Sequence, residues 1–190
     1  MLCKYITETS SMAEENLQRI RRISGTFRQL FNLFIITLPA ATIIFWLCFN
    51  QLPQSFKNDL PVIVSQNLPL SSLLLAITVS AIPTGIILYA FIKLRNLFSL
   101  YHKGVIFSVA NADCYRSLGY ALIYWAFSKL AFVPLISIVL TAHNPPGQKS
   151  LVLSIGSADM ANILIGSIVL LISWVMHEAS LMEEERSFTV

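Results

Sequence analysis

Residues 93–129 read KLRNLFSLYHKGVIFSVANADCYRSLGYALIYWAFSK, and this stretch decides how the rest of the chain is organised. Its first part carries apolar residues at i, i+3, i+4 and i+7, the spacing of one helix face. Those residues are Leu94, Leu97, Phe98 and Tyr101. Its last part is an apolar run that contains a single lysine. We therefore expect one membrane helix to arrive, a short polar turn, and a second membrane helix to return.

Gly104 and Ser108 mark the turn between these two helices. Glycine enters the left-handed conformation that ends many helices without steric cost, so Gly104 predicts the end of the first helix. Ser108 is a preferred N-cap residue and predicts that the second helix begins at the next position. Together with Phe107, Asn111 and Arg116 they form a candidate loop motif. We interpret this motif either as a basic connector at the membrane surface or as a docking site for a cytoplasmic protein partner.

The composition places the chain among polytopic membrane proteins. Of its 190 residues, 55% are hydrophobic and 12% are charged, whereas a soluble domain has about 25% charged residues. Four apolar runs each approach the ~20 residues that a helix needs to cross the lipid bilayer. We expect an all-α fold, a four-helix bundle of transmembrane spans forming one domain over residues 30–176. The spans cover about residues 30–49, 70–92, 118–140 and 153–176.

The segments that flank this domain are polar. In residues 1–29, apolar residues recur at helical intervals among arginines, which predicts an interfacial amphipathic helix on an anionic membrane surface. An arginine cluster is also typical of nucleic-acid binding, but the apolar run that follows directly favours the membrane. No direct binding of nucleic acid is therefore expected. Residues 177–190 carry four glutamates and form an acidic tail.

The distribution of positive charge predicts the orientation. Ten of the 13 lysines and arginines lie in residues 1–29, in the 93–117 loop or in the tail, and two lie in the 51–69 and 141–152 loops. Since positive residues stay on the cytoplasmic side, both termini and the 93–117 loop are expected there. The expected location is the inner membrane of a bacterium.

Lys129 is the remaining positive residue, and it lies within the third span. A charge at such a depth costs at least ~2.5–3.5 kcal/mol and usually finds a partner inside the protein. At 1.5 Å per helical residue, Lys129 lies ~16 Å below the outer boundary, Asp159 ~9 Å and Asn162 ~14 Å. The fourth span carries a stripe of polar or small residues, which are Asp159, Asn162, Gly166, Ser173 and His177.

Lys129, Asp159 and Asn162 therefore form a candidate polar site within the membrane. Three interpretations remain open. The first is a site for a substrate, an ion or a proton. The second is a structural ion pair that fixes the register of two helices. The third is a cation–π contact between Lys129 and Trp125, one turn away.

Motifs of enzymes and metal sites are absent from the sequence. The three histidines stand alone, without a second ligand at metal spacing, and the three cysteines form no disulfide framework. There is no nucleophile elbow, phosphate-binding loop or dinucleotide fingerprint. We expect neither enzymatic activity nor a cofactor or metal.

Two places in the chain resemble a known family. Around the turn, the pattern "L-F-x-L-Y, G-x-I-F-S, N, R, G" is matched by Leu97, Phe98, Leu100, Tyr101, Gly104, Ile106, Phe107, Ser108, Asn111, Arg116 and Gly119. Near the end, VMHEA at 175–179, then EE at 184–185 and FTV at 188–190, resembles "V-M-x-E-A, E-E, F-V". These motifs are similar to those of small bacterial membrane proteins grouped as domain of unknown function 2975. The resemblance implies four spans with both termini inside, and it implies no activity.

Two functions agree with these observations. The first is a non-enzymatic regulatory or interaction protein that presents its 93–117 loop and its tails to a cytoplasmic partner, because most polar residues and both motifs lie on that side. The alternative is a small transporter or channel subunit with a polar site between the third and fourth spans. Four short helices enclose little space, so this alternative predicts a homo-oligomer.

Overall fold

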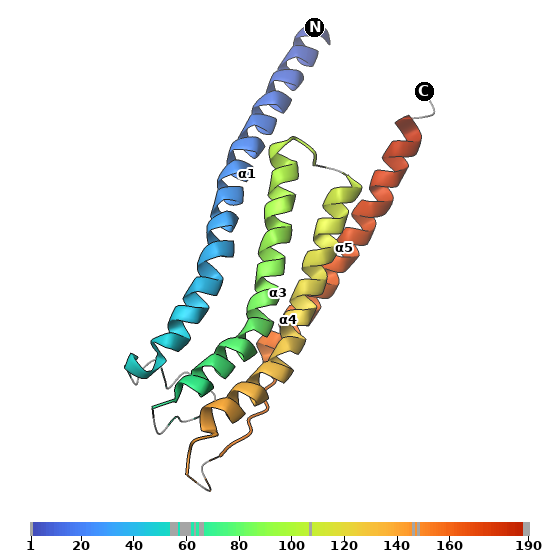
Figure 1. Cartoon of the computed structure of the whole chain (residues 1–190). Coiled ribbons are helices and arrows are strands. Elements are labelled where there is room, and N and C mark those ends of the chain that lie inside the picture. Colours follow the sequence, from blue (N-terminus) through green and yellow to red (C-terminus); the bar gives the residue numbers. More distant parts are fainter. Residues whose placement is uncertain are drawn as a thin grey trace.

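The computed structural model describes residues 2–53, 57, 62, 64, 67–106, 108–145, 147 and 149–187, without the side chains of residues 2–17, 19 and 183–187. The regular structure in these ranges is helical. In chain order the elements are α1 (Leu2–Leu47), the 3-10 turn η1 (Phe49–Gln51), α3 (Leu70–His102), α4 (Val109–Thr141) and α5 (Ser157–Ser187) (Figure 1). The four α-helices are all long and apolar enough to cross a membrane, which confirms the predicted fold class.

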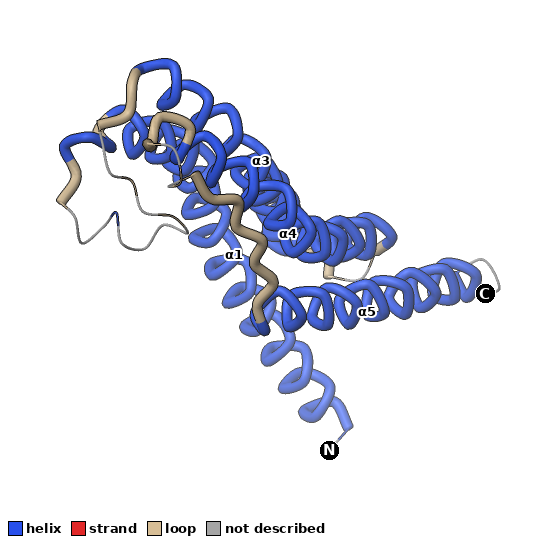
Figure 2. Tube along the Cα trace, turned by 90° about the horizontal axis from the view of Figure 1, so that it is seen from below, coloured by secondary structure: helices blue, strands red, loops and turns tan. Residues whose placement is uncertain are grey.

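The four helices lie in an open row and do not close into the expected bundle. α1 packs on α3, α3 on α4 and α4 on α5, and no other pair of described helices packs along its length. Figure 2 shows α1 and α5 diverging towards the chain termini. Short connections favour contacts between consecutive elements. The start of α1, the end of α5 and the α3–α4 turn lie together at what we call the terminal end (Figure 1).

α1 is longer than the predicted first span at its N-terminal end. The helix is continuous over 46 residues, so residues 2–29 and the first span form one helix, and the position of residues 2–29 on the membrane surface stays a prediction. Between residues 20 and 47, the residues least favourable to a helix are Gly25 and Pro39. A glycine costs a helix only ~1 kcal/mol, and a membrane helix tolerates a proline, so neither interrupts α1.

A small core holds the helices together at the end opposite the termini. Trp46 of α1 and Phe49 of η1 are buried. They pack in one cluster with Leu73 of α3 and Ile136 of α4. The indole Nε1 of Trp46 donates a hydrogen bond of 2.8 Å to Ser80 Oγ. This contact satisfies the one polar group of the buried ring.

The fourth helix begins after a stretch of non-helical chain, whereas the sequence predicted a helix from about residue 153. α5 starts at Ser157, and residues 149–156 run back along α4 without helical structure. Val152 N–H donates to Ser137 Oγ at 3.2 Å. Gly156 then disfavours a helix start any earlier.

Candidate functional site

Gly104 ends α3 as predicted. Its φ of 83° lies in the left-handed region. Its N–H donates to Tyr101 O at 2.9 Å, and Val105 N–H donates to Leu100 O at 3.0 Å. These two bonds form a Schellman motif, which satisfies carbonyl groups at the end of a helix. The turn is therefore defined by its backbone.

Ser108 and Asn111 complete the turn from the other side. Ser108 is the N-cap of α4, as predicted, and its Oγ accepts a hydrogen bond from Asn111 N–H at 3.3 Å. The side chain of Asn111 is fully buried. Its Nδ2 donates to Val105 O at 3.0 Å and to Ile106 O at 2.7 Å. The sequence indicated Asn111 as a motif residue but not this role in holding the turn. Phe107 lies outside the described residues.

The turn is also attached to α1, a contact that the sequence analysis did not predict. His102 Nδ1 lies 2.9 Å from Arg21 O and acts as the donor, because a carbonyl only accepts. Gly25 lies beside this ring, and a β-carbon there would lie 3.5 Å from His102 Nδ1, an ordinary contact distance. The guanidinium of Arg21 lies over Gly104, 3.1 Å from the position of a β-carbon on that residue.

Arg116 lies apart from this turn. It forms an exposed ion pair with Asp113, one turn earlier on α4, at 2.5 Å. It also lines a cavity of about 220 Å³ with Trp174 and His177 of α5. The candidate loop motif therefore separates into a structural turn and a side chain at the α4–α5 boundary.

Lys129 and Asp159 are in direct contact. Lys129 Nζ lies 2.6 Å from Asp159 Oδ1. The other carboxylate oxygen, Oδ2, accepts a hydrogen bond of 2.9 Å from Gly156 N–H. Asp159 is the third residue of α5, so this bond is half of a capping box, and its negative charge is favourable at a helix N-terminus. Among the described residues, the cation–π contacts are Lys57–Phe49 and Lys93–Tyr89, so Lys129 does not use Trp125 in this way.

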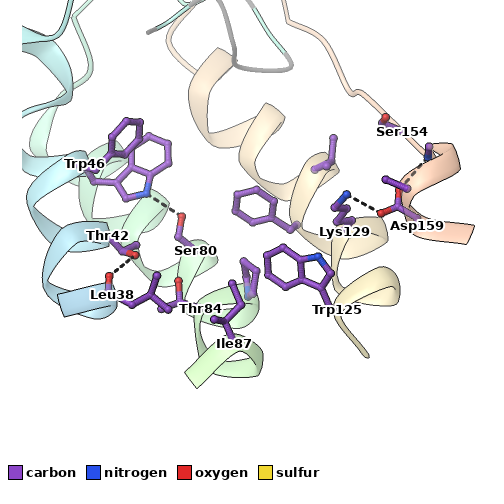
Figure 3. A pocket seen from close by; sticks show the side chains of 16 residues that line it. Leu38, Thr42, Trp46, Ser80, Thr84, Ile87, Trp125, Lys129, Ser154 and Asp159 are labelled. Carbon is purple, nitrogen blue, oxygen red and sulfur yellow. Dashed lines mark hydrogen bonds and ion pairs between the residues drawn. The ribbon is translucent and has the colours of Figure 1, made fainter. Parts of the chain in front are cut away.

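The ion pair forms part of the wall of a cleft of about 580 Å³. The lining residues come from all four helices and from the extended segment before α5. Figure 3 shows Lys129 and Asp159 on one side and Trp46 with Ser80 on the other. The side chain of Lys129 is 34% exposed, whereas that of Asp159 is 7% exposed. Within the described residues, no group of three or more His, Cys, Asp or Glu side chains could hold a metal ion.

The remaining stripe residues of α5 do not join the ion pair. Asn162 lines a separate, mainly apolar cavity of about 440 Å³ between α3, α4 and α5. Gly166 packs against Gly119 of α4. Ser173 is buried, and its Oγ donates to Ala112 O at 2.7 Å. Small residues and hydroxyl groups are typical of helix contacts in membranes, so much of this stripe is a packing face.

Four spanning helices, a compact turn at the terminal end and an ion pair within the row define a small polytopic membrane protein of the four-span class. The family described as "Protein of unknown function (DUF2975)" matches residues 37–190, most of the chain, so this protein belongs to that family. The predicted resemblance is thereby confirmed. No curated protein and no solved structure matches the chain.

Proposed function

We propose that this protein is a non-enzymatic membrane protein that binds a cytoplasmic protein partner through its terminal end. One observation carries this proposal. α1 and α5 both extend past the α3–α4 turn at that end, so two helical rods flank the turn (Figure 1). The charge distribution supports a cytoplasmic location for this end, because most lysines and arginines lie there. In a bacterium the membrane would be the inner membrane.

The contacts of the turn would couple such a partner to the membrane helices. His102 holds the end of α3 to Arg21 of α1, and Asn111 holds the turn to the start of α4. A partner that shifts the extension of α1 would therefore also act on the turn. This arrangement suits a regulatory or adaptor role more than a passive anchor.

Affinity capture of the full-length protein from native membranes tests this function. Gly104→Leu would strain a left-handed residue and displace Arg21, so the partner should be lost. Gly147→Leu is the matched control, because Gly147 also has a positive φ of 90° but lies in the loop between α4 and α5. Capture of the same proteins by wild type and by both variants would contradict the proposal.

A second candidate function is a small transporter or channel subunit. Its site would be the cleft. The specific observation in its favour is that the Lys129–Asp159 pair lies on a wall to which all four helices contribute. An open row of four helices encloses no pathway by itself, so this function would need a homo-oligomer. Proton or potassium flux into vesicles that contain the purified protein is the test. Equal flux in wild type, Lys129→Met and protein-free vesicles would remove this candidate.

A further inference from the structure

The non-helical segment 149–156, which precedes α5, lies beside an apolar part of α4. Val152 is opposite Ser137, and Asp159 is opposite Lys129. Twelve residues separate Lys129 from Thr141 at the end of α4, which is ~18 Å along a helix axis. Residues 130–141 of α4 carry no charge. The extended segment 149–156 therefore occupies a depth at which the neighbouring helix is suited to hydrocarbon.

Part of the backbone of this segment has no hydrogen-bond partner. Val152 N–H reaches Ser137 and Gly156 N–H reaches Asp159. Within the part of the chain that the structure describes, the N–H groups of residues 153–155 donate to no acceptor. Lipid cannot satisfy these groups, and irregular backbone at membrane depth is tolerated only where it is buried in protein or lines water.

The cleft is next to these unpaired groups. Ser154, Gly156 and Ala158 line it, and so does Lys129, whose side chain is partly exposed and whose charged group prefers water. Successive side chains of extended chain point to opposite faces. Accordingly, Ser154 lines the cleft, whereas Leu153 is 70% exposed and lines none of the cavities described above.

We infer that the cleft is a water-filled vestibule, open on the side of the α4–α5 connection, through which small hydrophilic solutes reach the Lys129–Asp159 pair. The hydroxyl groups of Thr42, Ser80 and Thr84 contribute to the opposite wall. A solute in the vestibule would meet one cationic and one anionic group about halfway along α4. This inference concerns access from one side and does not depend on a partner at the terminal end.

Reaction of single cysteines with a charged, membrane-impermeant methanethiosulfonate tests the vestibule. The full-length protein, in sealed membranes, carries serine at its three native cysteines. The reagent is applied to the side on which Lys149→Cys, in the α4–α5 loop, reacts. Because the thiolate forms in water and not in hydrocarbon, Ser154→Cys should react to completion and Leu153→Cys should stay unmodified. Ala158→Cys and Met160→Cys repeat the comparison on α5, because Ala158 lines the cleft and Met160 does not.

Each other outcome would overturn the inference. If Ser154→Cys and Ala158→Cys both stay unmodified while Lys149→Cys reacts, protein or lipid fills the cleft. If Leu153→Cys and Met160→Cys react as fast as their neighbours, the segment lies in bulk water outside the membrane. The protein that has serine at its three native cysteines and carries no introduced cysteine is treated with the same reagent, and it gives the background rate.

Discussion

Gly119 of α4 and Gly166 of α5 touch backbone to backbone, and the relationship is reciprocal. A β-carbon on Gly119 would lie 2.9 Å from Gly166 O, and a β-carbon on Gly166 would lie 2.9 Å from Gly119 O. Since a backbone oxygen cannot move aside as a side chain can, Gly166→Ala must separate the two helices. We expect a loss of ~1–3 kcal/mol in stability, the usual cost of overpacking. Thermal unfolding of the purified protein in detergent measures it.

Gly85 provides the matched control for this prediction. It lies within α3, and a β-carbon there meets open space. Gly85→Ala should therefore raise stability by ~0.5–1 kcal/mol, because alanine loses less backbone freedom in a helix. Equal effects of the two alanine substitutions would show that the α4–α5 contact is not close.

The left-handed residue in the α3–α4 turn gives a second prediction. Gly104→Ala should destabilise the protein by ~1–2 kcal/mol because an L-residue at this φ carries steric strain. Gly147→Ala introduces the same strain at a φ of 90° but meets no neighbour, whereas Gly104 lies under Arg21. The difference between the two melting temperatures then reports the contact with α1. A larger effect at Gly147 would contradict this view of the turn.

Asn111 should matter more to stability than the N-cap beside it. Asn111→Leu removes the donor to two carbonyl groups, those of Val105 and Ile106, at a cost of ~1–3 kcal/mol for unsatisfied groups. Ser108→Gly should lower the stability by only a few tenths of a kcal/mol, because glycine is an acceptable N-cap. Unfolding curves of both variants test the order. An Asn111→Leu variant as stable as Ser108→Gly would show that water replaces the amide.

The turn could be predicted from the sequence because its signals are local. Gly104 and Ser108 fix the end of one helix and the start of the next through bonds that span only a few residues. The four crossings were likewise visible as apolar runs. The attachment of His102 to Arg21 joins residues 81 positions apart, and nothing in either neighbourhood specifies the other.

The candidate site was only partly predictable for a similar reason. Depths counted along the helices predicted that Lys129 lies near Asp159, and the two residues do form an ion pair. These depths depend on a helix from about residue 153, which also places Asn162 with the pair. Because α5 begins at Ser157, Asp159 lies in its first turn, where it also caps the helix. Hydropathy alone does not distinguish apolar extended chain from apolar helix, so the later start escaped prediction.

The asymmetric exposure of the Lys129–Asp159 pair leads to the last prediction. Lys129→Met leaves the Asp159 carboxylate, which is 7% exposed, with Gly156 N–H as its only donor among the described residues. Asp159→Asn leaves a lysine whose side chain is 34% exposed and whose ammonium group keeps an oxygen neighbour. Breaking a fully buried pair costs ~3–5 kcal/mol. We expect Lys129→Met to approach this range and Asp159→Asn to cost clearly less, because water in the cleft reaches the lysine.

Combining the two changes separates stability from function. The double variant Lys129→Met/Asp159→Asn carries no charge at the site, and asparagine retains an acceptor for Gly156 N–H, so it should be more stable than Lys129→Met alone. Melting of the two single variants and the double variant gives their coupling, and complementation of a deletion strain gives activity. If Asp159→Asn costs as much as Lys129→Met, the cleft is dry around the lysine. Full complementation by a stable double variant would remove the transport function, since no charged group would then remain at the pair to handle a solute.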